Sequence, residues 1–250
     1  MADFLDHAGV LAFAHRCDHL AGPENTMAAF EGAVMLGYRY LETDIHCSQD
    51  GYLLAFHDSS LDRVTNQSGL IANLDYASIQ RARIAGSHSI PLIEDLIDAF
   101  PDARINIDLK SDQTVKPFMA LVKRLQCQDR ICVGSFSSAR VEAIRANFPN
   151  VCTSLSPKEV GWLRLRSYHV PTPSIEGRCA QIPERTGRIR LLDQRLLHTA
   201  HKLGIQVHVW TINDESEMAR LADLGVNGIM TDQAALLKDV LTERNLWTSA

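Results

Sequence analysis

The sequence of 250 residues lacks the features that mark several common classes of protein. No run approaches the roughly 18 apolar residues of a membrane span, so stable membrane insertion is not expected. The first residues include neither a cationic segment nor a long apolar stretch, and we expect no secretory signal. With a formal net charge of −5 and no basic stripe interleaved with aromatics, nucleic acid is not an expected partner.

The six cysteines form no Cys-x-x-Cys pair, and their spacing matches no zinc module. We therefore expect reduced thiols in a cytoplasmic protein. Several fall in predicted strands, where a free thiol packs as a small apolar side chain. The cysteines are Cys17, Cys47, Cys127, Cys132, Cys152 and Cys179.

Strand-like and helix-like segments alternate along the chain, which has the composition of an ordinary globular protein, 46% hydrophobic and 22% charged. Such alternation over this length favours a (β/α)8 barrel or a doubly wound sheet. No Gly-x-Gly-x-x-Gly follows the first strand, which argues against a dinucleotide-binding sheet. We expect one domain over residues 1–250. Its eight strands are predicted at residues 10–14, 40–47, 104–110, 131–136, 151–155, 179–182, 205–212 and 228–230.

Two prolines predict helix starts, because proline suits the first turn of a helix. The first helix is expected over residues 23–36 and another over residues 91–100. Residues 59–90 are expected to be irregular, with a short helix near residues 76–79. The proline- and arginine-rich residues 166–178 are expected to form a loop or lid.

The most informative segment is the second predicted strand, where Glu42 and Asp44 are two residues apart. Side chains alternate across a strand, so the two carboxylates share one face. Neighbouring carboxylates repel each other and are costly to desolvate unless a cation lies between them. The pair therefore predicts a divalent metal site, and oxygen ligands favour Mg²⁺ or Ca²⁺. The plainer alternative is loop capping, or pairing with Arg16 or Arg39.

Other polar side chains also fall at the ends of predicted strands. The carboxyl ends of barrel strands meet at one mouth, so these side chains can converge there. Each has a structural alternative: a hydrogen-bonded histidine, a simple ion pair or a core tryptophan. The candidates are His15, His57, Asp108, Lys110, His208 and Trp210. The other histidines are expected to be surface or structural residues, namely His7, His19, His46, His88, His169, His198 and His201.

Short motifs follow one another along the chain at residues 14–16, 23–26, 41–44, 56–58, 61–63, 90–94, 106–110, 210–213 and 225–232. Taken together, these motifs resemble the glycerophosphodiester phosphodiesterase family, and they occur in the family's order from near the start to near the end of the chain. The resemblance implies a single (β/α)8 barrel of the phospholipase C-like phosphodiesterase type, with a small or reduced insertion at residues 59–90.

The resemblance also implies roles for individual residues. His15 and His57 would be the acid/base pair. Arg16 and Lys110 would bind the phosphate, and Trp210 would line the glycerol side of the pocket. Glu24 and Asn25 would shape the first loop. The divalent cation, Mg²⁺ or Ca²⁺, would be held by Glu42, Asp44 and Asp108.

The chain departs from the family pattern at two positions and in one segment. Cys17 stands where the family usually has glycine, so either the turn is reshaped or a thiol faces the site. Asp108 replaces a usual glutamate and reaches about 1.5 Å less, roughly one C–C bond. The ion would therefore shift, or a water would bridge the gap. The segment between His57 and Pro91 is short, so part of the substrate wall is expected to be missing.

The expected activity is metal-dependent hydrolysis of glycerophosphodiesters, a class of small-molecule substrate, to sn-glycerol 3-phosphate and an alcohol. One alternative is a lysophospholipase D or a sphingomyelinase D-like enzyme using the same site. Another is a non-catalytic barrel that binds a phosphodiester or a protein. The sequence leaves the alcohol, the attacking oxygen and the oligomeric state open.

Overall fold

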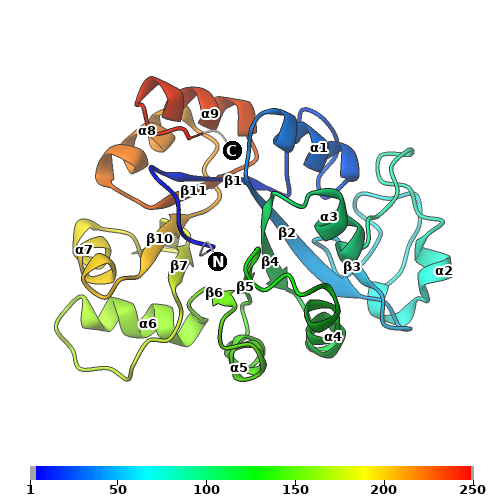
Figure 1. Ribbon diagram of the computed structural model, residues 1–250, viewed down its shortest axis with the longest axis horizontal. Helices are drawn as coiled ribbons and strands as arrows, with labels where there is room; N and C mark the ends of the chain where they lie inside the picture. The colour runs from blue at the N-terminus through cyan, green and yellow to red at the C-terminus, as the bar shows by residue number, and fades with distance from the viewer. Residues whose placement is uncertain (1–3, 249–250) are drawn as a thin grey trace.

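The computed structural model describes residues 4–248, and eight parallel strands surround its centre (Figure 1). They follow the order β6-β5-β4-β2-β1-β11-β10-β7, and a single parallel bridge from Ser154 to Cys179 joins the two outer strands. The sheet is thus a nearly closed barrel, as predicted. These strands are β1 Leu11–His15, β2 Tyr40–Cys47, β4 Arg104–Leu109, β5 Ile131–Gly134, β6 Cys152–Thr153, β7 Cys179–Ile182, β10 Gln206–Val209 and β11 Gly228–Thr231.

Helices cover the outside of the barrel (Figure 1), and apolar side chains between them and the strands form the main core. Strands buried on both faces suit a parallel sheet. Within residues 4–248, none of the helices is long and apolar enough to cross a membrane. The helices are α1 Met27–Met35, α2 Tyr76–Ile79, α3 Ile93–Ala99, α4 Val115–Leu125, α5 Ser138–Asn147, α6 Pro157–Arg166, α7 Gln194–Lys202, α8 Glu215–Leu224 and α9 Ala234–Glu243, with 3-10 turns η1 Ile71–Asn73 and η2 Asp112–Thr114.

The first helix begins later than predicted. The structure starts α1 at Met27, and Thr26 caps it by accepting a hydrogen bond from the backbone N–H of Ala29. Asn25 has a left-handed φ of 57°, which interrupts helical geometry before the cap. Pro23 therefore belongs to a loop at the barrel mouth, not to the first helical turn.

The insertion between β2 and α3 is a compact unit. Its strand β3 (Leu53–Ala55) pairs antiparallel with the end of β2, and the predicted short helix is present as α2. The insertion has its own buried cluster, formed by Leu54, Phe56, Leu61, Ile71, Ile79, Ala82, Ile84 and Ile90. A second feature, the hairpin of β8 (Arg185–Thr186) and β9 (Ile189–Arg190), was not predicted.

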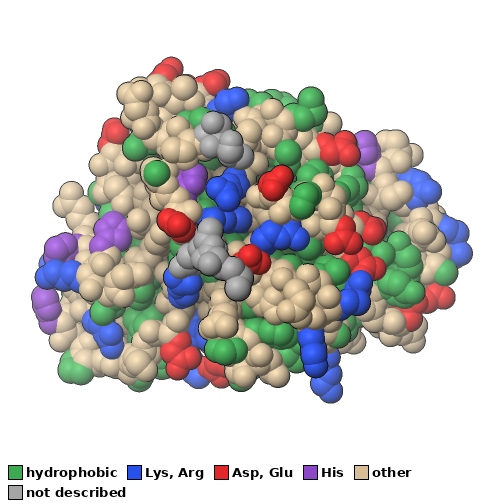
Figure 2. Space-filling model, in the orientation of Figure 1, with side chains coloured by type: hydrophobic (Ala, Val, Ile, Leu, Met, Phe, Trp, Pro, Cys, Tyr) green, Lys and Arg blue, Asp and Glu red, His purple; other side chains and the backbone are tan. Residues whose placement is uncertain are grey.

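The amino-terminal segment covers the end of the barrel opposite the strand carboxyl ends. The carbonyl of Phe4 accepts hydrogen bonds from Tyr40 Oη (2.9 Å) and Arg104 Nη1 (2.7 Å). Figure 2 shows this face, on which acidic and basic side chains are intermixed. It therefore offers no continuous basic stripe.

His208 lies inside the barrel and is fully buried, so the prediction that grouped it with residues at the mouth was wrong. Its Nε2 is 3.0 Å from Gln206 Oε1, and burial lowers the pKa of His208 to about 3. An unfolded histidine titrates near pH 6.5. Between pH 3 and pH 6.5, therefore, His208 is protonated in the unfolded chain but not in the folded one.

This difference predicts that His208 makes folding less favourable as the pH falls below about 6.5. Between pH 7 and pH 5 we expect it to cost about 2 kcal/mol of unfolding free energy. Urea unfolding at several pH values should show a flatter dependence in His208→Gln, because an amide does not titrate. Equal slopes for the variant and the unmodified protein would contradict the prediction.

Candidate active site

The carboxyl ends of β1, β2 and β4 bring the predicted residues together at the barrel mouth. In the parallel register, His15 is the Cα partner of Glu42, and Asp44 is the partner of Asp108. Neighbouring partners in a parallel sheet point to the same side. Register alone therefore places this histidine and three carboxylates around one opening.

His15 is held in place by a carboxylate from the far end of the chain. Its Nδ1 lies 2.6 Å from Asp232 Oδ1, and Asn213 Nδ2 donates to the other oxygen of Asp232 at 2.8 Å. The hydrogen bonds from His15 and Asn213 outweigh burial and lower the pKa of Asp232 to about 2. An ionised carboxylate only accepts, so Nδ1 of His15 donates, and its Nε2 is left as the reactive nitrogen.

The charge around His15 favours its protonated form. Burial alone would lower its pKa, but the charges of Glu42 and Asp232, together with the Asp232 hydrogen bond, outweigh burial and raise the pKa of His15. The Nε2 atom lies 3.9 Å from Glu42 Oε2. The open nitrogen therefore faces the carboxylate cluster.

His57 is held in the same way by its neighbour in the chain. Its Nδ1 lies 2.6 Å from Asp58 Oδ1, and a hydrogen bond from Arg63, with a smaller contribution from His57, lowers the pKa of Asp58 to about 2. The carbonyl of His57 is 3.0 Å from Nε2 of His46, which was expected to be a surface or structural residue. Both candidate catalytic imidazoles thus bond a carboxylate through Nδ1 and leave Nε2 available.

Ion pairs connect the insertion to the loop after β1. Arg63 pairs with Asp58 and also donates from Nη2 to Glu24 Oε1 at 2.6 Å. Glu24 in turn accepts from Arg16 Nη1 at 3.2 Å. The prediction that Glu24 shapes this loop agrees with these contacts, and the network fixes the His57 loop relative to β1.

Asp44 and Asp108 share the ammonium group of Lys110. Lys110 Nζ lies 2.6 Å from Asp44 Oδ1 and 2.8 Å from Asp108 Oδ2. Although burial alone would lower the pKa of Lys110, the two carboxylates raise it, so the side chain stays charged. Arg16 adds its backbone N–H, which donates to Glu42 Oε2 at 3.1 Å.

The oxygens of these carboxylates that face away from Lys110 fit a hard cation. Asp108 Oδ1 is buried and has no hydrogen-bond partner. Asp44 Oδ2 is also buried without a hydrogen bond, but it forms an ion pair with Arg16, whose Nε lies 3.3 Å away. Burial and the neighbouring charge of Asp44 raise the pKa of Glu42 to about 7. An oxygen-only donor set with unsatisfied buried atoms suits Mg²⁺ or Ca²⁺. In the described residues, however, the three carboxylates do not come within 4.8 Å of one another as a group, so they would have to move closer to share one ion.

Aromatic residues form another side of the mouth. Trp210 follows β10, and its ring lies 6.0 Å from that of Phe136 in an edge-on arrangement. Phe136 is 72% exposed, and Lys110 Nζ lies 5.9 Å from its ring centre. Trp210 therefore lies near the predicted phosphate-binding lysine, on an apolar side of the opening.

The thiol of Cys17 does not face solvent. Its side chain is fully buried and packs in the main core. Arg16 and Cys17 both adopt left-handed φ values, 51° and 71°. Glycine adopts this geometry without strain, so the turn has the backbone geometry that suits the glycine expected here from the resemblance.

Sequence reasoning gave no role to the carboxylates that bond the predicted histidines, or to the side chains that bond those carboxylates in turn. Asp58, Arg63, Asn213 and Asp232 all lie in the matching segments, so the order of motifs was the signal that could have found them. His19, expected to be a surface or structural residue, lies with Nε2 3.7 Å from Asp232 Oδ1.

Comparisons with known proteins point to one family. The profile of the glycerophosphoryl diester phosphodiesterase family matches residues 15–236. The chain is 35% identical to a probable glycerophosphodiester phosphodiesterase 2 of Mycobacterium tuberculosis, over 99% of this chain and 97% of that protein. It is 31% identical to a lysophospholipase D of Homo sapiens, over 87% and 82% of the two chains.

Solved structures support the same fold. An Oleispira antarctica phosphodiesterase, solved in complex with the product sn-glycerol-3-phosphate, superposes with a TM-score of 0.80 at 22% identity, covering 94% of this chain and 97% of that one. A related Silicibacter pomeroyi protein superposes equally well, with a TM-score of 0.80 at 23% identity and 98% coverage of both chains.

Proposed function

The chain belongs to the glycerophosphoryl diester phosphodiesterase family and is a phosphoric diester hydrolase, and on this basis we propose that it converts glycerophosphodiesters to sn-glycerol 3-phosphate and an alcohol. The observation that carries the proposal is the pair of imidazoles, His15 and His57, each bonded through Nδ1 to a carboxylate. Histidine titrates near neutrality, so one ring can accept a proton while the other donates one.

The cationic side chains are suited to the charge of the substrate. A phosphodiester is anionic and repels an attacking oxygen, so its charge must be neutralised. Lys110 and Arg16 lie beside the carboxylate cluster and would bind the phosphate oxygens. A divalent cation held by Glu42, Asp44 and Asp108 would supply further neutralisation when bound.

The proton transfers follow from the open Nε2 atoms. One imidazole takes the proton of the attacking hydroxyl, which is that of water or of the substrate's own glycerol. The other gives a proton to the leaving alkoxide, so that P–O cleavage releases a neutral alcohol. The Asp232 and Asp58 bonds hold the two rings in the tautomer that these steps need.

A coupled assay for sn-glycerol 3-phosphate tests this activity. The substrates are the choline, ethanolamine, glycerol and inositol phosphodiesters of glycerol, each with Mg²⁺ or Ca²⁺ and then with chelator. We expect cation-dependent release of glycerol 3-phosphate from at least one of them. Phosphorus NMR on the same samples identifies a cyclic phosphate if the substrate's own hydroxyl attacks. No release from any substrate with either ion would overturn the proposal.

Lysophospholipase D activity is the second candidate, and the exposed apolar rim favours it. Phe136 is 72% exposed and Leu20, in the loop after β1, is 75% exposed. An acyl chain lying on this rim would bury apolar surface. The same assay series with lysophosphatidylcholine separates the candidates: Leu20→Ser should lower kcat/KM for the lysolipid by about 10-fold and leave glycerophosphocholine unchanged.

A further inference from the structure

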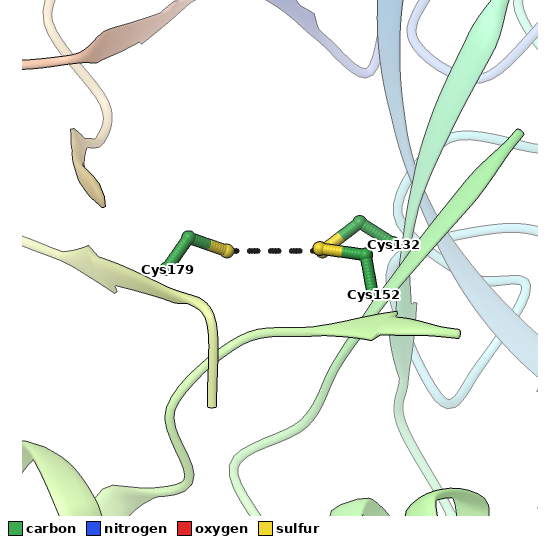
Figure 3. A group of neighbouring side chains, drawn as sticks. All are labelled: Cys132, Cys152 and Cys179. Carbon is green, nitrogen blue, oxygen red and sulfur yellow. Dashed lines mark hydrogen bonds between the residues drawn. The ribbon is translucent and has the colours of Figure 1, made fainter. Parts of the chain in front are cut away.

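Three buried cysteines meet inside the barrel, away from the candidate active site. Cys132 on β5, Cys152 on β6 and Cys179 on β7 form no disulfide, and none is more than 2% exposed. Figure 3 shows Cys179 facing the other two across the barrel interior. Their sulfur atoms all lie within 4.8 Å of one another, and within residues 4–248 no other set of three potential ligands (His, Cys, Asp or Glu) does so.

The spacing of the sulfurs matches that of a thiolate metal site. Cys132 Sγ and Cys179 Sγ are 3.8 Å apart. Two sulfurs bound to one ion at about 2.3 Å with tetrahedral angles would also lie about 3.8 Å apart. Cys132 and Cys152 are Cα partners in the sheet, so they point to the same side. The three sulfurs could therefore coordinate one ion with little movement of the backbone.

The cluster also spans the part of the barrel where backbone pairing between neighbouring strands is shortest, between β6 and β7. Strand β6 has only two residues, and the bridge from Ser154 to Cys179 is what joins its end to β7. The three cysteines come from the strands on both sides of this seam. An ion bound to all three would tie β5, β6 and β7 together where the backbone ladder is shortest.

We propose that Cys132, Cys152 and Cys179 form a binding site for a soft d¹⁰ divalent cation of the Zn²⁺ and Cd²⁺ type, which closes the β6–β7 seam. Thiolates are the preferred ligands of such ions. On binding, the ion replaces two thiol protons, which pass to solvent. The two thiolates then balance the charge of the ion, and the remaining thiol is a neutral ligand. The site is neutral overall, as burial among apolar residues requires.

The site is distinct from the predicted Mg²⁺ or Ca²⁺ site. Cys132 is level with Asn106 in the sheet, two residues before the position of Asp108 on β4. The cysteines belong to a buried hydrophobic cluster that also contains Phe4, Phe13 and Met230. Hard cations prefer oxygen ligands and soft cations prefer sulfur, so the two sites select different ions.

Refolding with Cd²⁺ tests the site and avoids the need for an ion to enter a closed core. The full chain is refolded from urea with a phosphine reductant and Cd²⁺, and free ion is then removed. We expect one Cd²⁺ per chain by elemental analysis, together with a thiolate-to-metal charge-transfer absorption. The loaded protein should melt about 5–10 °C higher than the metal-free protein.

Matched variants identify the ligands. Cys127→Ala removes an equally buried cysteine outside the cluster and should still bind one equivalent. Cys152→Ala and Cys179→Ala should each lose the absorption band and the thermal shift. Circular dichroism checks that each variant unfolds cooperatively.

The metal-binding results decide between an ion site and simple packing of small side chains. A refolded, unmodified protein that retains no Cd²⁺ overturns the proposal, and this result stands even if a variant fails to fold. Binding that survives Cys152→Ala or Cys179→Ala also overturns it. None of these measurements depends on phosphodiesterase activity.

Discussion

His15→Ala and His57→Ala are each expected to lower kcat by about 10²–10⁴-fold while the protein stays folded. Each substitution removes one imidazole from the proposed proton transfers and leaves the cation and the phosphate-binding side chains in place. Both histidines are partly exposed at the mouth, so neither change creates a cavity in the core. The measurement is initial-rate kinetics on the best substrate of the series.

Matched variants separate catalysis from a general effect of losing a histidine. His198→Ala, on the exposed face of α7, should keep full activity. Asp232→Asn keeps a side chain of the same shape but no longer fixes the His15 tautomer, so we expect a smaller loss of kcat with an altered pH–rate profile. Activity above a tenth of the original in His15→Ala or in His57→Ala would show that the residue is not part of the acid/base pair.

The fold and the meeting of His15, Glu42, Asp44 and Asp108 could be predicted from the sequence because both depend on local patterns. Apolar runs mark the strands, and alternation fixes which side chains share a face. In a parallel barrel the carboxyl ends of all strands lie at the same end of the barrel. Residues at these strand ends therefore lie close together, independently of the loop conformations. Register then places Asp44 beside Asp108.

The partners of the two histidines were harder to predict. Asp232 contacts His15 across 217 residues of sequence, and no local pattern links the two. Arg63 reaches Glu24 only because the insertion folds back over the loop after β1. The prediction put His208 at the mouth because alternation shows which face of a strand a residue occupies. It does not show how deep the residue lies along the barrel axis.

The shared ammonium of Lys110 also could not be predicted. Alternation puts Asp108 and Lys110 on one face, but the sequence does not say whether the lysine faces substrate or the neighbouring carboxylate. In the structure it bonds both Asp44 and Asp108. On Asp108 the oxygen that bonds Lys110 differs from the unpartnered one, so a lysine contact and a cation contact are compatible on that carboxylate. On Asp44 the second oxygen forms an ion pair with Arg16, which a cation would have to replace or share.

Chelation is expected to abolish activity, and Mg²⁺ or Ca²⁺ added in excess should restore it. Without a cation, Lys110 and Arg16 would have to neutralise the phosphodiester, and both already pair with carboxylates of the site. Removing this neutralisation should cost at least about 100-fold in kcat/KM. Rates measured after dialysis against chelator and after titration with each ion test the expectation, and an enzyme with unchanged rates in chelator would contradict it.

Asp44→Asn links this cation dependence to the proposed ligands. The amide keeps the shape of the side chain but removes the charge, so much more ion should be needed for half-maximal activity, with a lower maximum rate. Asp223→Asn is the control, because Asp223 is 68% exposed near the end of α8 and pairs with Arg244, not with a residue of the candidate site. If both variants respond to added ion as the unmodified protein does, Asp44 is not a ligand. A changed response confined to Asp44→Asn, with unchanged thermal unfolding, would show that its carboxylate binds the ion and does more than pair with Lys110.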